Sequence, residues 1–378
     1  MHPADQRHLG RSPARWTCER LPAKVVGITG SSGKTSTKDL VAQVLERAGE
    51  TVAPPGSYNN EIGLPLTVLS AGESTDYLVL EMAARGTGHI AWLCEIAPPD
   101  VGVVLNVGVA HLGEFGSREA IAQAKGELVE ALKPDGLAVL NGRDPLVREM
   151  RSRTTARVVE TGVDYVAEDA TPDELSRMSF TLVTPNGRAP VVLRLAGEHH
   201  VDNALAVAAV GEWAGLTTRQ VAGALSAATP RSRWRMEVTD VDGITVVNDA
   251  YNANPDSMRA ALRTLARAGE SGRRTWAVLG EMAELGDAAW EAHDEIGRLC
   301  VRLDVKRLVV VGANAKGIHA GASHEGSWGD EAAFVEDAGA ALALLRAELK
   351  EGDVVLVKAS RAAGLERVAL ALTGEAAA

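Results

Sequence analysis

Short apolar runs alternate with amphipathic stretches along most of this chain. The runs at residues 25–29, 77–81, 101–107 and 137–140 are almost continuously apolar, and residues 118–132 repeat apolar positions at helical spacing. Nearly continuous apolar strands are typical of a parallel sheet that is covered on both faces. Strands that alternate with helices build such a sheet. The pattern therefore predicts an α/β fold with a mostly parallel sheet.

A second unit of the same kind follows Pro230. Its strand and helix patterns lie in ITVVNDAYNANPDSMRAAL, TWAVLGEMAELG, RLVVVGANA and DVVLVKASRAAGLERV. Residues 151–200 show short strand patterns separated by turns, which indicates a β-rich lobe at the end of the first unit. We expect a linker at residues 1–22, a phosphate-binding central domain at 23–229 and a Rossmann-like α/β domain at 230–378.

Composition and charge mainly exclude classes of function. The net charge of −11 gives no basic field for nucleic acid. No run approaches the about 20 apolar residues of a membrane span. The three cysteines, Cys18, Cys94 and Cys300, lack metal-ligand spacing and are expected to be buried thiols in a reducing compartment. We therefore expect a cytoplasmic protein, a monomer without membrane or nucleic-acid partners.

The first strand pattern changes to a helix pattern at a glycine-rich loop. The loop reads Gly30-Ser31-Ser32-Gly33-Lys34-Thr35-Ser36. The two glycines allow backbone N–H groups to turn toward phosphate oxygens, Lys34 can reach the terminal phosphates, and Thr35 can hold Mg²⁺. Ile28 stands where the strict phosphate-loop pattern has glycine, so the loop is a shortened variant. The flanking strand and helix favour an ATP or GTP site over a surface Gly-Ser turn.

Polar residues follow two of the predicted strands, where an open α/β sheet places its ligands. Glu81 ends the strand at residues 77–81, and His111 follows the strand at 101–107 within a few residues. A carboxylate at that position can bind Mg²⁺ or its water shell. The alternatives are a solvated glutamate at a strand end and a histidine that belongs only to a turn.

Three further features allow both a functional and a plain structural interpretation. By itself, Lys125 on the amphipathic stretch at 118–132 would be a surface lysine, and Asn203 near a helix start would be a capping residue. The cluster Arg231, Arg233 and Arg235 would either neutralise a transferring phosphate or form interdomain salt bridges.

Several separated motifs together resemble the Mur ligase family. They are TGSSGKTST, NNEIGLPLTVL, LEMAARGTGHI, NVGVAHLGEFGS, AKGEL, GEHHVDNALAVAAV, DAYNANPDSM, VLGEMAELG and LVKASR. They cover about residues 22 to 370 in family order. The chain departs from the family pattern at His200, where the family usually has asparagine, and at Ala359, where it usually has glycine.

The resemblance implies a nucleotide site and two metal sites. The nucleotide phosphates would be bound by the loop residues Gly30, Ser31, Ser32, Gly33, Lys34, Thr35 and Ser36. Thr35 and Glu81 would hold a first Mg²⁺, and His111 and Lys125 a second. Lys125 would be N-carboxylated, because a carbamate turns the cation into an oxygen ligand. Lys34, His111, Lys125 and Arg235 would form the catalytic group.

The resemblance also implies contacts to the rest of the nucleotide and to the substrates. Asn203 would contact adenine, Arg235 phosphate, and Asp249 ribose. The substrate contacts would be Asn59, Asn60, Asn252, Asn254 and Lys358.

The implied reaction is ATP-dependent amide formation between small molecules. DAYNANPDSM and VLGEMAELG favour, within the family, the ligase that joins D-alanyl-D-alanine to UDP-N-acetylmuramoyl-tripeptide through an acyl phosphate, in peptidoglycan precursor synthesis. The family's N-terminal domain, which grips the UDP end of the substrate, is expected to be absent. The alternatives are a Mur-type ligase that acts on a non-UDP carboxylate in another pathway, and a truncated, inactive ATP-binding module.

Overall fold

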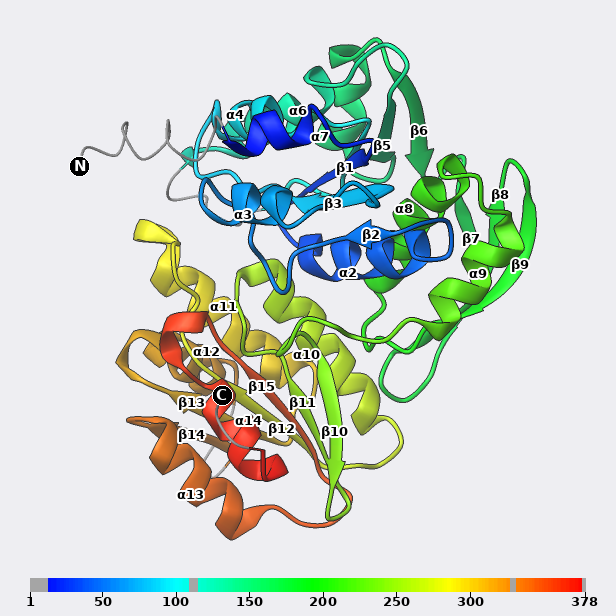
Figure 1. Cartoon of the computed structure of the whole chain (residues 1–378). Helices are drawn as coiled ribbons and strands as arrows, with labels where there is room; N and C mark the ends of the chain where they lie inside the picture. The colour runs from blue at the N-terminus through cyan, green and yellow to red at the C-terminus, as the bar shows by residue number, and fades with distance from the viewer. Residues whose placement is uncertain (1–12, 109–114, 327–330, 376–378) are drawn as a thin grey trace.

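The computed structural model describes residues 13–108, 115–326 and 331–375. Two α/β units lie one above the other, and a small antiparallel sheet extends beside the first (Figure 1). We call residues 24–227 the first unit and residues 237–373 the second unit.

The sheet of the first unit is parallel throughout, as the apolar runs predict. Its strands run in the order β2-β3-β1-β4-β5-β6. They are β1 (Lys24–Thr29), β2 (Thr51–Val52), β3 (Tyr77–Glu81), β4 (Val101–Val104), β5 (Leu137–Asn141) and β6 (Arg157–Thr161). β4 is shorter than predicted, because Asn106 turns toward the glycine-rich loop, where its Oδ1 accepts a hydrogen bond from Ser32 N at 2.9 Å.

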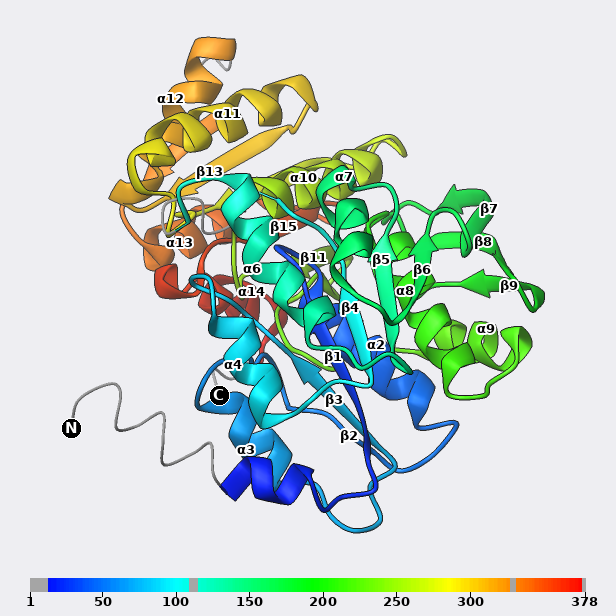
Figure 2. The same cartoon turned by 90° about the horizontal axis from the view of Figure 1, so that it is seen from above.

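Helices cover both faces of this sheet and enclose two apolar cores (Figure 2). Val26 and Ile28 point to the core that contains α2 (Lys34–Leu45), α8 (His200–Trp213) and α9 (Thr218–Ala227). Val25 points to the other core, which contains residues of α3 (Gly63–Leu69), α4 (His89–Ile96), α6 (Arg118–Glu130) and α7 (Pro145–Arg148). Burial on both faces explains why these strands are apolar almost without interruption.

Two glycines that pair across neighbouring strands bring α6 close to the sheet. Gly27 of β1 pairs with Gly102 of β4. A Cβ atom at Gly27 would lie 2.9 Å from Leu128 Cδ1, and one at Gly102 would lie 3.2 Å from Leu128 Cγ. A larger residue at either position would require the Leu128 side chain or α6 itself to shift.

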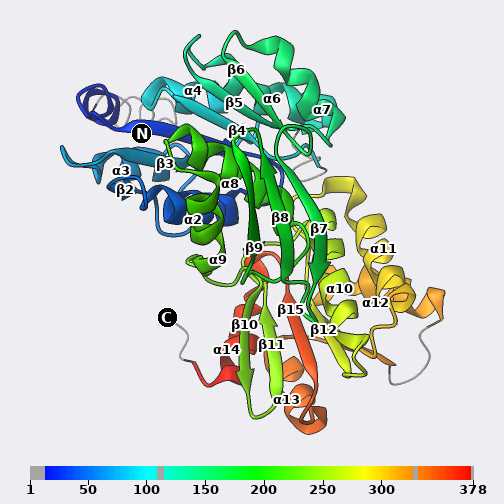
Figure 3. The same cartoon turned by 90° about the vertical axis from the view of Figure 1, so that its right-hand side faces the viewer.

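The β-rich stretch forms a separate antiparallel sheet of β7 (Val166–Pro172), β8 (Met178–Thr184) and β9 (Gly187–Val192) (Figure 3). Phe180, Leu182 and Val191 point from it into the core that contains α8 and α9. The prediction of short strands is therefore confirmed, except that β6 joins the main sheet.

The second unit repeats the architecture. Its strand order is β10-β11-β15-β12-β13-β14, with only β10 antiparallel to its neighbour among the described strands. The strands are β10 (Glu237–Val241), β11 (Ile244–Asn248), β12 (Thr275–Leu279), β13 (Arg307–Val311), β14 (Ala332–Val335) and β15 (Val354–Lys358). α10 (Pro255–Gly269), α11 (Ala289–Arg302) and α12 (Lys316–Glu325) contribute to one core, and α13 (Ala338–Glu348) and α14 (Glu366–Thr373) to the other. Short 3₁₀ turns lie at Gly286–Ala288, Ala313–Ala315 and Arg361–Ala363 in this unit, and at Glu149–Arg153 in the first unit. The predicted fold class is confirmed.

Two expectations from the sequence need correction. Residues 13–18, expected to lack a core, are helical, and Ala14 is fully buried in the core that contains α4. Cys94 and Cys300 are buried, but Cys18 is only half-buried, and all three thiols are free. None of the described helices is long and apolar enough to cross a membrane.

Candidate active site

A cavity of about 680 Å³ lies between the two units. It opens at the carboxyl ends of β1, β3, β4 and β5, and the ends of β11 and β15 face it from the second unit. This is the edge where parallel α/β sheets bind their ligands. Its lining includes Lys34, Thr35, Glu81, Asn203, Arg235, Asp249 and Lys358.

The glycine-rich loop has the form of an anion-binding turn at the start of α2. Gly33 has a φ of 80°, a left-handed conformation that glycine adopts without strain. Lys34 Nζ donates to Gly30 O at 2.7 Å. Burial lowers the pKa of Lys34, the charge of Glu81 opposes this, and the charge of Arg235 adds to it. A partly buried cation at a helix N-terminus is suited to a phosphate group.

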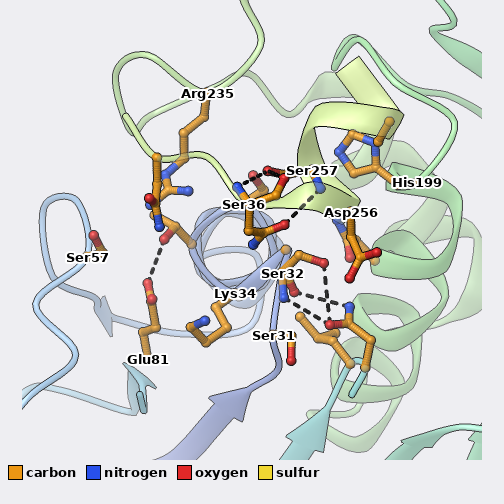
Figure 4. Close-up of a pocket in the computed structure, with 18 of the residues that line it drawn as sticks. Ser31, Ser32, Lys34, Ser36, Ser57, Glu81, His199, Arg235, Asp256 and Ser257 are labelled. Atoms are coloured by element: carbon orange, nitrogen blue, oxygen red, sulfur yellow. Dashed lines mark hydrogen bonds between the residues drawn. The ribbon is translucent and has the colours of Figure 1, made fainter. Parts of the chain in front are cut away.

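Glu81 is the centre of a buried group of oxygen and amide side chains (Figure 4). Thr35 Oγ1 donates to Glu81 Oε2 at 2.8 Å, and Asn59 Nδ2 donates to Glu81 Oε1 at 2.7 Å. Glu81 is 1% exposed, so the alternative of a solvated glutamate is wrong. A hydroxyl and a carboxylate beside a phosphate loop fit Mg²⁺, which prefers oxygen ligands.

Lys125 is buried, with 4% of its surface exposed. The alternative of a surface lysine is therefore wrong. Burial lowers the pKa of Lys125 well below its ordinary value, and the nearby charge of Lys34 lowers it further. A neutral amine is the form that reacts with CO₂ to give a carbamate, so the environment suits the predicted modification. His111 lies outside the described residues.

Asn203 lies in the first turn of α8, within the cavity lining. The N-cap of α8 is His199, so the capping interpretation of Asn203 is wrong. Its Nδ2 lies 3.2 Å from His200 Nδ1. His200 is buried, and burial, followed by the charge of His199, lowers its pKa well below the ordinary value. His200 is therefore neutral near pH 7, and Nδ1 can accept from the Asn203 amide.

The second unit contributes a buried ion pair to the cavity wall. Lys358 Nζ donates to Asp249 Oδ2 at 2.6 Å and to the backbone oxygen of Asn252 at 2.9 Å. Asp249 Oδ1 accepts from Met236 N at 3.1 Å. Asp249 is thus already engaged by two donors, and a ribose hydroxyl would have to share its oxygens.

Of the three arginines in the cluster, Arg231 forms an ion pair across the predicted domain division, Arg233 forms one within the predicted second domain, and Arg235 lines the cavity. Arg231 pairs with Glu46 at 2.5 Å, and Arg233 pairs with Glu375. Arg235 lines the cavity, its guanidinium lies 4.2 Å from the ring centroid of Tyr251, and its buried Nε has no hydrogen-bond partner among the described residues. Only Arg235 is therefore available to a phosphate.

The remaining predicted substrate residues do not gather at one point. Asn60 is exposed and outside the lining, and its Oδ1 accepts from the backbone N–H groups of Ile62 and Gly63. Asn254 is in the lining, but its side chain caps α10 in a reciprocal arrangement with Ser257. The structure therefore gives Asn60 a role in a turn and Asn254 a role in a helix cap.

Several residues of the site were not singled out from the sequence. Asn106 fixes the loop through Ser32, and Ser57 Oγ lies 2.5 Å from Tyr251 Oη across the two units. Asp256, at the start of α10, approaches Gly108 so closely that a Cβ there would meet its carboxylate. For Asn106, its place directly after a buried strand was an available signal.

Comparison with known proteins assigns the class. The family model for the Mur ligase middle domain matches residues 28–211, and that for the Mur ligase, glutamate ligase domain matches residues 234–361. The chain therefore belongs to the Mur ligase family, as the motifs indicated.

Three relatives show how far the similarity extends along the chain. The UDP-N-acetylmuramoyl-tripeptide--D-alanyl-D-alanine ligase of Mycobacterium tuberculosis is 57% identical over 372 residues, which cover 93% of this chain and 73% of the relative. The crystal structure of MurF from Acinetobacter baumannii matches with a TM-score of 0.89 at 30% identity, over 98% of this chain and 81% of that one. MurF ligase from Thermotoga maritima, solved in complex with ADP, matches with a TM-score of 0.85 at 32% identity, over 97% of this chain and 83% of that one.

Proposed function

We propose that this chain is an ATP-dependent ligase that joins D-alanyl-D-alanine to UDP-N-acetylmuramoyl-tripeptide in peptidoglycan precursor synthesis. The carrying observation is the cavity in which Lys34 and Glu81 of the first unit converge with Lys358 of the second unit and with Arg235 of the segment between the units. The 57% identity to the Mycobacterium tuberculosis enzyme supports this choice of substrates.

The reaction needs an activated carboxylate, since a free carboxylate is a poor electrophile. The terminal carboxylate of the tripeptide attacks the γ-phosphorus of ATP, and ADP leaves, which gives an acyl phosphate. The amine of D-alanyl-D-alanine then attacks the acyl carbon. The tetrahedral intermediate loses inorganic phosphate and a proton to give the amide.

In this scheme the residues of the cavity bind the substrates and neutralise the charge of the phosphates. Lys34 of the first unit and Arg235 of the segment between the units would contact the β- and γ-phosphates and offset the charge that develops on phosphoryl transfer. Thr35 and Glu81 would hold Mg²⁺, which when bound neutralises phosphate oxygens. Asn203 and Asp249 would orient adenine and ribose, and Asn59, Asn252 and Lys358 would face the peptide substrates.

Lys125 is proposed to carry a carbamate that, with His111, binds a second Mg²⁺. Its burial and lowered pKa support the modification, because the neutral amine is available near pH 7. Without modification or a metal, its ammonium would be a buried charge close to Lys34, which is costly.

We further propose a domain division at residues 229 and 230 and a monomeric enzyme. The two family models stop and start on either side of that division. The described residues that line the cavity come from both units of one chain.

The test is a coupled assay with all three substrates. Phosphate release should require ATP, UDP-N-acetylmuramoyl-tripeptide and D-alanyl-D-alanine together, and mass spectrometry should detect the pentapeptide product. Release of phosphate that does not depend on the acceptor amine, or the absence of any amide product, would contradict the proposal.

A further inference from the structure

The segment that joins the two units is fastened to the helix of the phosphate loop. We call residues 229–236 the strap. Gln43 of α2 forms two reciprocal hydrogen bonds with the backbone of Thr229, at 3.0 and 3.1 Å. Glu46, the C-cap residue of α2, binds the guanidinium of Arg231 with both carboxylate oxygens. The first residues of the strap are therefore fixed to the C-terminal end of α2.

A buried ion pair on the same helix makes the third attachment. Asp39 Oδ2 accepts from Ser232 N at 2.9 Å, and Asp39 Oδ1 pairs with Lys38 Nζ at 2.6 Å. The exposed fractions are 6% for Asp39 and 1% for Lys38. Lys38 Nζ also donates to the backbone oxygens of Pro54 and Gly56. A fully buried charge held by three acceptors has little freedom to move.

The strap ends in a strained turn around Arg235. Trp234 has a φ of 60° and Met236 a φ of 50°, the left-handed region that bulky residues rarely adopt. Trp234 N donates to Glu237 Oε2, Met236 N donates to Asp249 Oδ1, and Tyr251 N donates to Trp234 O. Strained backbone persists only where its surroundings hold it, and it is concentrated at functional sites.

We infer that Asp39 is a positioning residue for Arg235. It fastens the strap, three residues before Arg235, to the same helix whose N-terminus carries Lys34, so the two cations keep a fixed relation although they lie far apart in the sequence. The inference rests on the proposed role of Arg235 at the nucleotide phosphates. Lys38 supports it by holding the Asp39 carboxylate in one orientation.

The test is a double-mutant cycle read out by calorimetric affinity for ATP with Mg²⁺. Arg235→Ala should weaken ATP binding, and Asp39→Ala should weaken it about tenfold, the effect of one lost hydrogen bond to a charged group. The double variant should bind ATP no more weakly than Arg235→Ala alone, because Asp39 acts through Arg235. Asp39→Asn, which has the same shape, replaces Asp39→Ala if the latter does not fold, and it should show a smaller effect of the same non-additive kind.

A matched control is Asp353→Asn in the second unit. Asp353 is also a buried carboxylate, paired with Arg274 at 2.6 Å, but it is outside the cavity lining. This variant should lose stability and keep its affinity for ATP.

The possible failures are distinguishable. The inference is overturned if substitution of Asp39 weakens ATP binding equally with and without Arg235. It is also overturned if the Asp39 variant that folds binds ATP as tightly as the unmodified protein. Unchanged affinity of Arg235→Ala overturns the role of Arg235 and the inference with it. A non-additive cycle in a protein that forms no amide product contradicts only the proposed function.

Discussion

Lys125 is buried and Lys34 is partly buried, and they lie close enough for the charge of Lys34 to lower the pKa of Lys125. Their surroundings differ in one respect. Lys34 has Glu81 nearby to favour its charged form, whereas no acidic group within the described part of the chain raises the pKa of Lys125. The two side chains are thus suited to opposite states, a cation at the phosphates and a neutral amine open to carboxylation.

Substitution of Lys34 should abolish catalysis and preserve the fold. Lys34→Ala removes the cation nearest the transferring phosphate, so we expect the rate of ADP formation to fall about 10²- to 10³-fold. Circular dichroism should remain unchanged. Lys24→Ala, at an exposed lysine of the preceding strand, is the control. ADP formation by Lys34→Ala at the rate of the unmodified protein would show that the loop does not serve the phosphates.

Substitution of Lys125 separates a carbamate from a plain lysine. Lys125→Ala should lose most acyl-phosphate formation, with partial recovery on addition of short-chain carboxylates that supply the missing oxygens. Loss of one metal ligand costs several kcal/mol in the transition state, or at least about 10²-fold in rate.

The matched control for this substitution is Lys133→Ala, an exposed lysine just after α6, which should keep full activity. The unmodified protein should lose activity after mild acid and regain it with bicarbonate, and ¹³C-bicarbonate should give a carbamate signal by NMR. An inert response to both treatments would exclude the modification.

At the scale of elements, the N-terminal cap of α10 both stabilises the helix and forms part of the cavity wall. Asn254 and Ser257 form a capping box at its N-terminus, which lies in the cavity wall. Asn254→Ala should lower the free energy of unfolding by about 1 kcal/mol, since one backbone donor loses its partner. It should also raise the KM of a substrate, because the turn before α10 contains Asn252.

The cap of α13 offers a comparison with Asn254. Asp337 accepts from Ala340 N and lies outside the cavity lining. Asp337→Ala should cost a similar amount in urea unfolding and leave the KM unchanged. Equal KM values for both variants would mean that Asn254 acts only as a cap.

Elements were more predictable from the sequence than the contacts between them. β3 matches its apolar run of five residues, because burial on both faces leaves a local pattern. The burial of Lys125 could not be predicted from the sequence, because a single lysine beside the apolar stripe of α6 resembles a solvent-exposed one. Asp39 and Ser232 are 193 positions apart, so no local pattern could indicate their contact.

At the scale of the molecule, acid should destabilise the fold partly through His200. In the folded state the pKa of His200 lies well below its ordinary value, whereas in the unfolded chain it is about 6.5. Below that pH the unfolded state binds more protons, so stability falls as the pH falls, by up to about 1.4 kcal/mol per pH unit for one group.

His200→Asn should remove this part of the pH dependence. Urea unfolding at pH 7.0 and pH 5.5 should show a smaller difference for the variant than for the unmodified protein. His324→Asn, at an exposed position, should leave the difference as it is. An equal pH dependence in the variant and the unmodified protein would show that His200 does not titrate on unfolding.

The cross-strand pair of Gly27 and Gly102 has a consequence for how this sequence can vary. Leu128 occupies the space that both glycines leave free, and Lys125 lies almost one turn before it on α6. An alanine at either glycine would require the Leu128 side chain to shift, or α6 to move outward together with Lys125. We therefore expect a substitution that adds a methyl group at Gly27 or Gly102 to be tolerated best together with a smaller side chain at position 128.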